Sequence, residues 1–423
     1  MKTGGRFPAI SSPKHPCVIG VSSVAESLPR WPLHLALLLW ILFASALSIK
    51  DVFWAKAHSV YYPHYETGAR LWWAGQDVYK VSPTYKGCPF EFRYGPACAE
   101  ALVPLALLPT PLGGLLWSWL NLGLFFGALR TFMRRILPGC WTPGREGIFL
   151  CLVLVGVARS IWSGQSNLLI FALVALGMAA IADRRWWLAA LMLAIPVHIK
   201  VWPLAVALLL IACRPRPLAL RFGVCLLAVG ALPLLTHPFA WVCRQYGGWY
   251  EVLMGSAQIR HSYRDMWTIW ETIRPPVNAH IYMALQLATA AGVLGLCLWQ
   301  ARRRQSLARL LLFILVMWTS WQMEFGPATE RNTFGLIAPL TCWGLMTAFA
   351  ERRGRIVMTL AVLLTVMASY GIFERALRDG YPLMKDAHPL GVLLFTGWFL
   401  RWNWVSEEKT ESRLMPACPA AEF

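Results

Sequence analysis

The sequence predicts an all-α protein that crosses a membrane many times. Three observations lead to this prediction: 57% of the 423 residues are hydrophobic, only 14% are charged, and the apolar residues fall into separate runs. A soluble domain carries about 25% charged residues, and a membrane-spanning helix needs about 20 consecutive apolar ones. We expect about twelve spans, near residues 32–50, 110–131, 146–161, 166–182, 186–200, 201–213, 218–236, 281–300, 307–323, 333–349, 355–373 and 388–404.

The ends of the chain are more polar than its centre. A long polar stretch precedes the first apolar run, whereas a signal peptide has a short charged start, so this run is interpreted as an uncleaved helix. The expected division is a cytoplasmic tail over 1–31, a multi-pass membrane domain over 32–404 and a disordered cytoplasmic tail over 405–423. The runs 186–200 and 201–213 are short for a bilayer, and are tilted, kinked or not fully spanning.

Positive charge predicts the orientation. The chain has 39 Lys+Arg against 21 Asp+Glu, a net charge of +18, and no nucleic-acid motif interrupts the apolar runs. Arginines cluster in every second connection, as cytoplasmic loops do in a bacterial inner membrane. Both termini are therefore expected in the cytoplasm, with the loops 51–109 and 237–280 outside. The clusters are Arg130, Arg134, Arg135 and Arg145; Arg184 and Arg185; Arg214, Arg216 and Arg221; Arg302, Arg303 and Arg304; and Arg352, Arg353 and Arg355.

The outer loop 51–109 contains the pattern of an interfacial helix. In "HYETGARLWWAGQDVYK", aromatic residues recur at helical spacing and Gly75 ends the helix. We expect its aromatic face, formed by Tyr65, Ala69, Trp72 and Trp73, to lie on the membrane surface. Carboxylates just outside the bilayer could accept a proton from a sugar hydroxyl, although solvation or ion pairing is the favoured explanation for any single one. They are Asp51, Glu66, Asp77 and Glu91.

Two further motifs place polar groups at outer helix ends. In "SGQSN", Gln165 and Asn167 begin a helix whose free N–H groups favour an anion, and the alternative is a cap made by Ser163 or Ser166. In "HIK", Lys200 separates two apolar runs. Its ammonium either meets a phosphate or carboxylate there, or extends to the headgroups.

Arginines on the outer face point to phosphate binding. In "QIRHSYRDMW", Arg260 and Arg264 are four residues apart and would share one helix face, with an Arg264–Asp265 surface pair as the alternative. In "TERN", Thr329 can cap a helix and Glu330 favours its positive end. Arg331 opposes that helix dipole and needs an anion, which would be Glu330, Glu324 or a ligand phosphate.

Several short motifs, taken in order, resemble one known family. They are "GQDVY" with Gly75, Asp77 and Tyr79; "FRYGP" with Arg93, Tyr94 and Pro96; "GQSN" with Gly164, Gln165 and Asn167; "KVWP" with Lys200 and Pro203; and finally "YRDMW" and "FGPATERNTFGLIAP". Over residues 30–350 the chain resembles the DUF2029 proteins, which are glycosyltransferase family 87, in the version found in planctomycete-type bacteria.

The resemblance implies a GT-C-like membrane fold with the active site on the outer face. It implies an inverting, polyprenyl-phosphate-sugar-dependent transfer, of mannose or a pentose, to a lipid or glycan acceptor of the cell envelope. Membrane lipids are expected partners and nucleic acid is not. No cofactor and no metal site are expected, because no CxxC or Cys/His ligand spacing occurs, although a divalent cation is left open. The expected substrate-binding residues are Asp77, Tyr79, Arg93, Tyr94, Gln165, Asn167, Lys200, Arg260, Arg264, Glu330 and Arg331.

The sequence departs from the family at the expected general base. In mycobacterial members an aspartate comes shortly before a "VYY" segment, and here "HSVYYPHYE" has His58 or Tyr61 in its place. Glu66 and Asp51 rank equally as the catalytic base, with His58 behind them. Two other classes of function are alternatives: a polyprenyl-linked lipid transporter or flippase, and an O-antigen ligase or polymerase.

Overall fold

The computed structural model describes residues 29–54, 61–80, 84–85, 88–89, 92–256, 264–273, 276–303, 305–327, 329–366, 370 and 387–414. Within these residues the chain is helical apart from its turns and one pair of two-residue antiparallel strands, β1 (Thr84–Tyr85) and β2 (Cys88–Pro89). The predicted all-α class is confirmed.

Apolar helices form most of the structure. Four are long and apolar enough to cross a membrane: α1 (Trp31–Phe53), α4 (Thr110–Arg135), α5 (Pro143–Ser163) and α12 (Ala279–Arg302). The expectation of several membrane spans is confirmed, and their number stays a prediction. The shorter apolar helices are α3 (Pro96–Ala106), α6 (Asn167–Ala182), α7 (Trp186–Ile199), α8 (Leu204–Cys213), α14 (Ala338–Ala350) and α15 (Arg355–Val366).

The remaining helices extend or connect this set. The 3-10 helix η2 (Leu232–Leu235) follows α9 (Pro215–Gly230), and the 3-10 helix η3 (Arg331–Leu336) precedes α14. Three helices lie in the predicted outer loops: α2 (Tyr62–Trp73), α10 (Phe239–Ser256) and α11 (Met266–Ile273). The last two apolar helices are α13 (Leu307–Phe325) and α17 (Ala387–Leu414). Because α17 reaches Leu414, part of the segment 405–423 is helical, where the sequence predicted a disordered tail.

Polar residues in the connections fix where the helices begin. Thr142 caps α5 by accepting a hydrogen bond from the Arg145 backbone N–H at 3.3 Å. Asn278 caps α12 in the same way, with the N–H of His280 at 2.9 Å. Such caps satisfy N–H groups that have no partner inside the helix. Gly164 ends α5 in the left-handed region at φ 72°, where a side chain would be strained.

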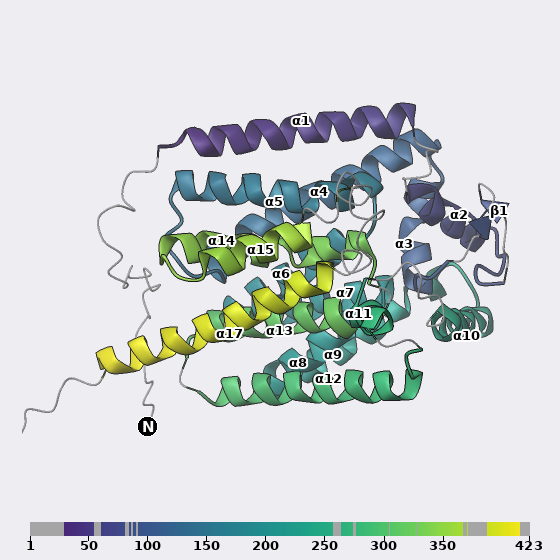
Figure 1. Ribbon diagram of the computed structural model, residues 1–423. Coiled ribbons are helices and arrows are strands. Elements are labelled where there is room, and N and C mark those ends of the chain that lie inside the picture. The colour runs from purple at the N-terminus through teal and green to yellow at the C-terminus, as the bar shows by residue number, and fades with distance from the viewer. Residues whose placement is uncertain are drawn as a thin grey trace, which may run out of the picture.

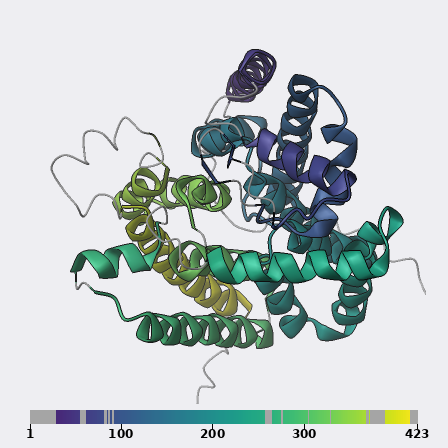
Figure 2. The same cartoon turned by 90° about the vertical axis from the view of Figure 1, so that its right-hand side faces the viewer.

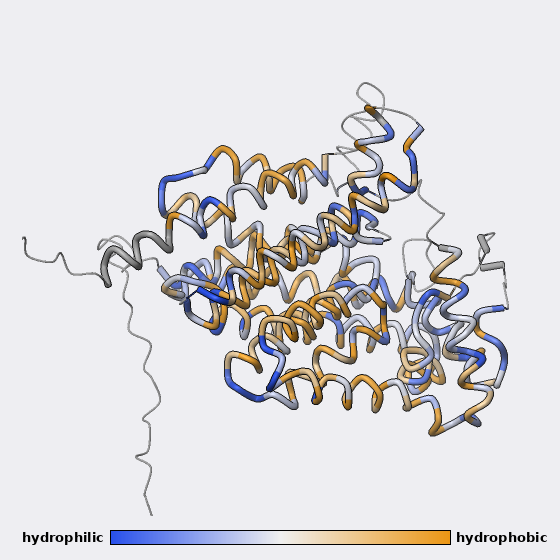
Figure 3. Tube along the Cα trace, turned by 90° about the horizontal axis from the view of Figure 1, so that it is seen from below, coloured by the Kyte–Doolittle hydropathy of each residue, from blue (hydrophilic) through white to orange (hydrophobic). Residues whose placement is uncertain are grey.

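The helices are arranged with two distinct ends. The long helices run beside one another, and α2, α3, α10, α11 and β1 gather at one end, on the right in Figure 1. The N-terminal end of α1 and the C-terminal end of α17 lie at the opposite end. Figure 2 views the molecule from the side of α2 and α10, with α1 end-on at its periphery. Apolar residues dominate the helices, and hydrophilic ones concentrate at the turns and around the end that carries α2 (Figure 3).

Helix α6 forms the buried centre of the molecule and packs against α4 and α7. Nearly all of its residues are buried, including Asn167 at its first position with 0% exposure. A polar side chain there must find hydrogen-bond partners within the protein. The start of α6 is therefore a fixed point for describing the polar residues at the end of the molecule that carries α2.

Candidate functional site

Helix α2 is present as predicted, but its aromatic face contacts protein. Tyr65, Ala69 and Trp72 are each 0% exposed, whereas Trp73 is 53% exposed. The Tyr65 ring lies 4.7 Å from that of Tyr94 and 4.9 Å from that of Trp117. The prediction that this face lies on the membrane surface is therefore wrong for Tyr65, Ala69 and Trp72, because α3, α4 and the residues around Tyr94 cover them. For the exposed Trp73 it stays a prediction.

Backbone contacts fix Arg93 and Tyr94 beside the end of α7. The Gly95 N–H donates to the His198 carbonyl at 3.1 Å. The Trp249 indole donates to the Arg93 carbonyl at 3.1 Å, and the Tyr79 hydroxyl donates to the Tyr94 carbonyl at 2.7 Å. The "FRYGP" motif is thus held by α7, by α10 and by the segment that follows α2.

Gly95 itself permits the close approach to α7. A Cβ on Gly95 would lie 2.4 Å from the His198 carbonyl oxygen. We expect Gly95→Ala to lower the free energy of unfolding by about 1–3 kcal/mol, the usual cost of overpacking. Thermal unfolding in detergent measures this effect, with Gly123→Ala as control because a Cβ at Gly123 meets no atom within 4 Å. Equal melting temperatures for the two variants would contradict the account.

A chain of hydrogen bonds links Lys200 to Glu330. The Lys200 Nζ donates to Asn167 Oδ1 at 2.8 Å, and Asn167 Nδ2 donates to Gln165 Oε1 at 2.7 Å. Gln165 Nε2 then donates to Glu330 Oε2 at 3.1 Å. Tyr61, Arg93 and Tyr94 adjoin this chain. The group is called the Lys200 cluster and consists of Tyr61, Arg93, Tyr94, Gln165, Asn167, Lys200 and Glu330.

Two tyrosines complete the cluster. The Tyr61 hydroxyl interacts with Gln165 and Glu330, and burial followed by the Glu330 charge raises the pKa of Tyr61. Burial likewise raises the pKa of Tyr94 well above its usual value. Both hydroxyls therefore keep their protons at neutral pH. The Lys200 ammonium lies 5.9 Å from the centre of the Tyr94 ring, within the range of a cation–π contact.

Lys200 is the main cation of the cluster. It follows the last residue of α7 and so lies outside the helices of the membrane domain. Burial lowers the pKa of Lys200 to about 8; Glu330 opposes this shift, and Arg93 adds to it. The ammonium is charged at neutral pH and poorly solvated, so an anion that reaches it is attracted strongly.

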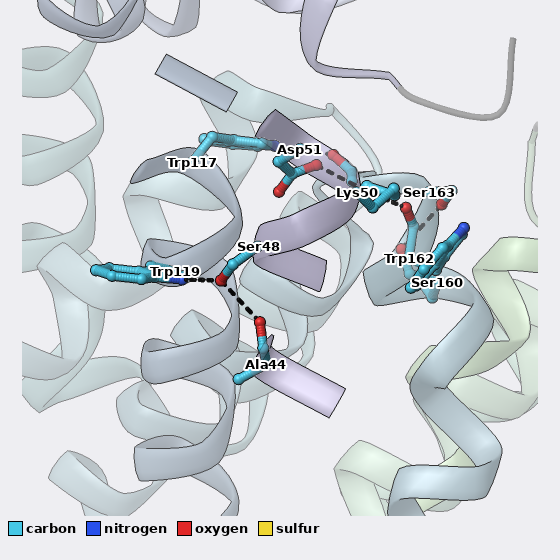
Figure 4. A network of polar contacts seen from close by, with 10 residues as sticks. Ala44, Ser48, Lys50, Asp51, Trp117, Trp119, Ser160, Trp162 and Ser163 are labelled. Carbon is cyan, nitrogen blue, oxygen red and sulfur yellow. Dashed lines mark hydrogen bonds and ion pairs between the residues drawn. The ribbon is translucent and has the colours of Figure 1, made fainter. Parts of the chain in front are cut away.

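The two candidates for general base lie outside the Lys200 cluster. Glu66 accepts hydrogen bonds from Arg70 Nε at 3.0 Å and from Thr110 at 2.9 Å, and its side chain is 9% exposed. Asp51 forms an ion pair with Lys50 at 2.8 Å, and the Lys50 Nζ also donates to the Trp162 carbonyl (Figure 4). Within the part of the chain that the structure describes, neither carboxylate bonds to a member of the cluster.

The two acids differ in what remains free. The contacts of Glu66 with Arg70 and Thr110 all fall on Oε1, and the one with Thr110 joins α2 to the start of α4. Asp51 Oδ2 is buried without a hydrogen-bond partner among the described residues. Asp51 also lies beside the end of α5, the helix that leads directly into Gln165. His58 and Glu91 lie outside the described residues.

Asp77 and Tyr79 have structural contacts. Asp77 Oδ1 accepts hydrogen bonds from the backbone N–H of Tyr79 at 3.0 Å and of Lys80 at 3.2 Å. This turn orients Tyr79 toward the Tyr94 carbonyl. Asp77 and Tyr79 thus hold the cluster in place through the backbone carbonyl of Tyr94.

Three arginines form a second group. Arg159, Arg264 and Arg331 all lie close enough to act electrostatically on His388 at the start of α17. The Arg264 N–H donates to the Thr329 carbonyl at 2.8 Å. Arg264 precedes α11 and is not helical. The prediction that Arg264 and Arg260 share one helix face is therefore wrong for Arg264. Arg260 lies outside the described residues.

The predicted caps around these motifs are also corrected. Ser163 donates to the Ser160 carbonyl, and Ser166 makes no side-chain cap of α6; instead its N–H donates to the Tyr65 hydroxyl at 3.0 Å. Thr329 donates to the Gln322 carbonyl, so Glu330 caps η3 together with Thr333. Glu330 combines two roles, because it ends the hydrogen-bonded chain from Lys200 as well.

Three residues of this region were not among the site residues expected from the sequence. Tyr61 was considered only as a replacement for the family aspartate, yet it adjoins both Gln165 and Glu330. Arg159 and His388 were not selected as site residues, since each lies near the end of an apolar run. Arg159 did stand out in the sequence, because in the expected orientation it departs from the positive-inside tendency.

No group of three or more His, Cys, Asp or Glu side chains in the described ranges is placed to hold a metal ion. The chemistry that the described side chains offer is the binding of an anion by Lys200 and Arg93, with hydrogen-bonding groups and a carboxylate beside them.

The fold and the site define a class of protein: a multi-pass membrane protein with a polar, cationic cluster among the helix ends that lie beside α2. The model of glycosyltransferase family 87 matches residues 92–323, more than half of the chain. The protein belongs to this family and is a membrane glycosyltransferase. Family membership agrees with the GT-C-like class expected from the sequence. The matched region contains Arg93, Tyr94, Gln165, Asn167 and Lys200.

Individual known proteins are similar to this chain over different lengths of sequence. The polyprenol-phosphate-mannose-dependent alpha-(1-2)-phosphatidylinositol pentamannoside mannosyltransferase of Mycobacterium tuberculosis is 25% identical over 330 residues, covering 74% of this chain and 70% of that protein. GPI mannosyltransferase 1 of Trypanosoma brucei brucei is 29% identical over 188 residues, 43% of this chain and 40% of that protein. The crystal structure of ArnT from Cupriavidus metallidurans bound to undecaprenyl phosphate gives a TM-score of 0.36 at 14% identity, with 87% of this chain and 77% of that chain covered.

Proposed function

We propose that this glycosyltransferase moves a mannosyl residue from a polyprenyl-phosphate donor to a lipid or glycan acceptor at the outer face of the bacterial inner membrane. A pentose is the second candidate for the sugar. Support comes from the family and from the Mycobacterium tuberculosis relative, whose name specifies a polyprenol-phosphate-mannose donor. The orientation, with both termini in the cytoplasm, rests on the positive-inside pattern of the arginine clusters.

One observation of the site supports this proposal best. Lys200 is a poorly solvated ammonium at the end of a membrane helix, held by Asn167 and accompanied by Arg93. A polyprenyl phosphate brings its phosphate to the same depth, because its chain stays in the bilayer and its charge stays at the surface. In the reaction the acceptor oxygen forms a bond to the anomeric carbon, and the bond from that carbon to the phosphate oxygen breaks. The leaving phosphate takes the electron pair, and Lys200 stabilises the charge that develops on it.

The proton of the acceptor hydroxyl needs a carboxylate, and we assign it to Asp51. Among the described residues, one buried oxygen of Asp51 has no hydrogen-bond partner, whereas the contact of Glu66 with Thr110 connects α2 to α4. Attack from the face opposite the phosphate gives inversion at the anomeric carbon. Tyr94 and Tyr79 offer aromatic surface to a sugar ring beside the phosphate site.

Transfer of labelled mannose from polyprenyl-phosphate-mannose in proteoliposomes tests this function. We expect product with a membrane-lipid or glycan acceptor extract, and no product from nucleotide-linked mannose. Polyprenyl-phosphate pentose, assayed in parallel, decides between the two sugars. Absence of transfer with every donor, together with movement of the intact donor across the bilayer, would replace the proposal with a lipid transporter.

A further inference from the structure

The hydrogen-bonded chain between Lys200 and Glu330 has a defined direction. Each of its three bonds has its donor on the Lys200 side and its acceptor on the Glu330 side. A side-chain amide can accept through its oxygen or donate through its nitrogen, so the shared direction of the three hydrogen bonds needs a cause. The ammonium can only donate and the carboxylate can only accept, and these two ends impose one orientation on both amides between them.

The surroundings keep this orientation rigid. Asn167 is 0% exposed and Gln165 is 5% exposed, so water does not compete for either amide. The N–H of Ser166, between them, donates to the Tyr65 hydroxyl at 3.0 Å. Glu330 is anchored by its own hydrogen bonds with Thr333 in the cap of η3. The two amides therefore act as aligned dipoles between two fixed charges.

The geometry points to Glu330 as a positioning residue that holds the Lys200 ammonium in its charged, oriented form through Gln165 and Asn167. This inference rests on the proposed function only in taking Lys200 as the cation that meets the donor phosphate. Glu330 would act at a distance, through a chain that joins the start of η3, the turn before α6, the first residue of α6 and the end of α7. The donor phosphate then meets a cation whose direction is already set, which reduces the reorganisation needed in the reaction.

The charges around Lys200 set the expected effect. Glu330 raises the pKa of Lys200, and Arg93 lowers it from the segment before α3. The Tyr94 ring faces the ammonium as well, and the Tyr94 hydroxyl stays neutral. Removing the Glu330 charge takes away a contribution that raises the pKa of Lys200, while burial and Arg93 still lower it. The protonation midpoint of Lys200 should then fall by about one pH unit, as expected for a charge several ångströms away at an effective dielectric constant near 20.

The test is the pH dependence of acetylation of Lys200, followed by mass spectrometry on the purified full chain in detergent. Acetic anhydride reacts with the neutral amine, so the rate reports its protonation without needing enzyme activity. Glu330→Gln should move the midpoint to lower pH, and Glu330→Asp should restore it in part. Gln165→Met keeps both charges but breaks the chain, and should also lower the midpoint. Glu251→Gln, on the exposed side of α10, is the matched control and should leave it unchanged.

An unchanged midpoint in Glu330→Gln and Gln165→Met would overturn the inference. The same variants should also be assayed for mannose transfer over a range of pH. As the pH is raised, their activity should fall at a lower pH than the activity of the wild type. A uniform loss at every pH, with no movement of that alkaline limb, would assign Glu330 a purely structural role. If the wild type transfers no sugar, the proposed function fails, and the acetylation midpoints still decide the inference about Glu330.

Discussion

Lys200→Ala is expected to reduce kcat/KM for mannose transfer by about 100-fold or more, the size seen when one charge-stabilising group is removed from an active site. The reason is that the leaving phosphate loses the poorly solvated ammonium that Asn167 orients. Steady-state transfer in proteoliposomes measures the effect. Lys80→Ala removes an exposed lysine at the same end of the molecule and serves as the control.

The same lysine predicts a pH dependence. Since burial lowers the pKa of Lys200 to about 8, its ammonium is charged below that pH and neutral above it. Transfer should therefore fall as the pH rises through about 8, and donor binding should fall with it. Full activity of Lys200→Ala, or a wild-type rate that is constant up to pH 10, would contradict the role of Lys200.

Asp51→Asn is expected to lower kcat by about 100-fold to 10,000-fold, the usual contribution of a general base. Asparagine keeps the shape of the side chain but cannot accept the proton of the acceptor hydroxyl. Donor binding should persist, because Asp51 makes no bond to the Lys200 cluster among the described residues. Single-turnover transfer and donor binding, measured side by side, separate the two steps.

Glu66→Gln is the comparison for Asp51→Asn. Glutamine can still accept from Thr110 and loses only the charge opposite Arg70, whose side chain is 47% exposed. An ion pair of this kind contributes about 0–1 kcal/mol to stability, so most of the activity should remain. Loss of transfer in Glu66→Gln with activity retained in Asp51→Asn would reverse the assignment of the base.

Sequence patterns could predict the helices because each apolar run corresponds to one continuous helical segment. The runs near 110–131 and 307–323 correspond closely to α4 and α13. The helix over Tyr62–Trp73 was also predictable, from its aromatic spacing and from Gly75. Its surroundings were not, because spacing identifies an apolar face without saying whether lipid or protein covers it.

The individual residues of the candidate site were predictable, but the contacts between them were not. Gln165, Asn167, Lys200 and Glu330 were each singled out, since a polar residue at membrane depth is costly without a role. The sequence gives no sign that Glu330 bonds to Gln165, because that contact joins residues 165 positions apart. The proximity of Arg331 to His388 likewise depends on how α17 packs.

The central claim is that the Lys200 cluster binds the donor phosphate. The most direct test is a cryo-electron microscopy structure of the protein with a non-transferable polyprenyl-phosphate-mannose analogue in lipid nanodiscs. The account predicts the phosphate within hydrogen-bond distance of the Lys200 ammonium, with Arg93 beside it and the sugar toward Tyr94. A phosphate bound among Arg159, Arg264 and Arg331, with Lys200 unliganded, would contradict it.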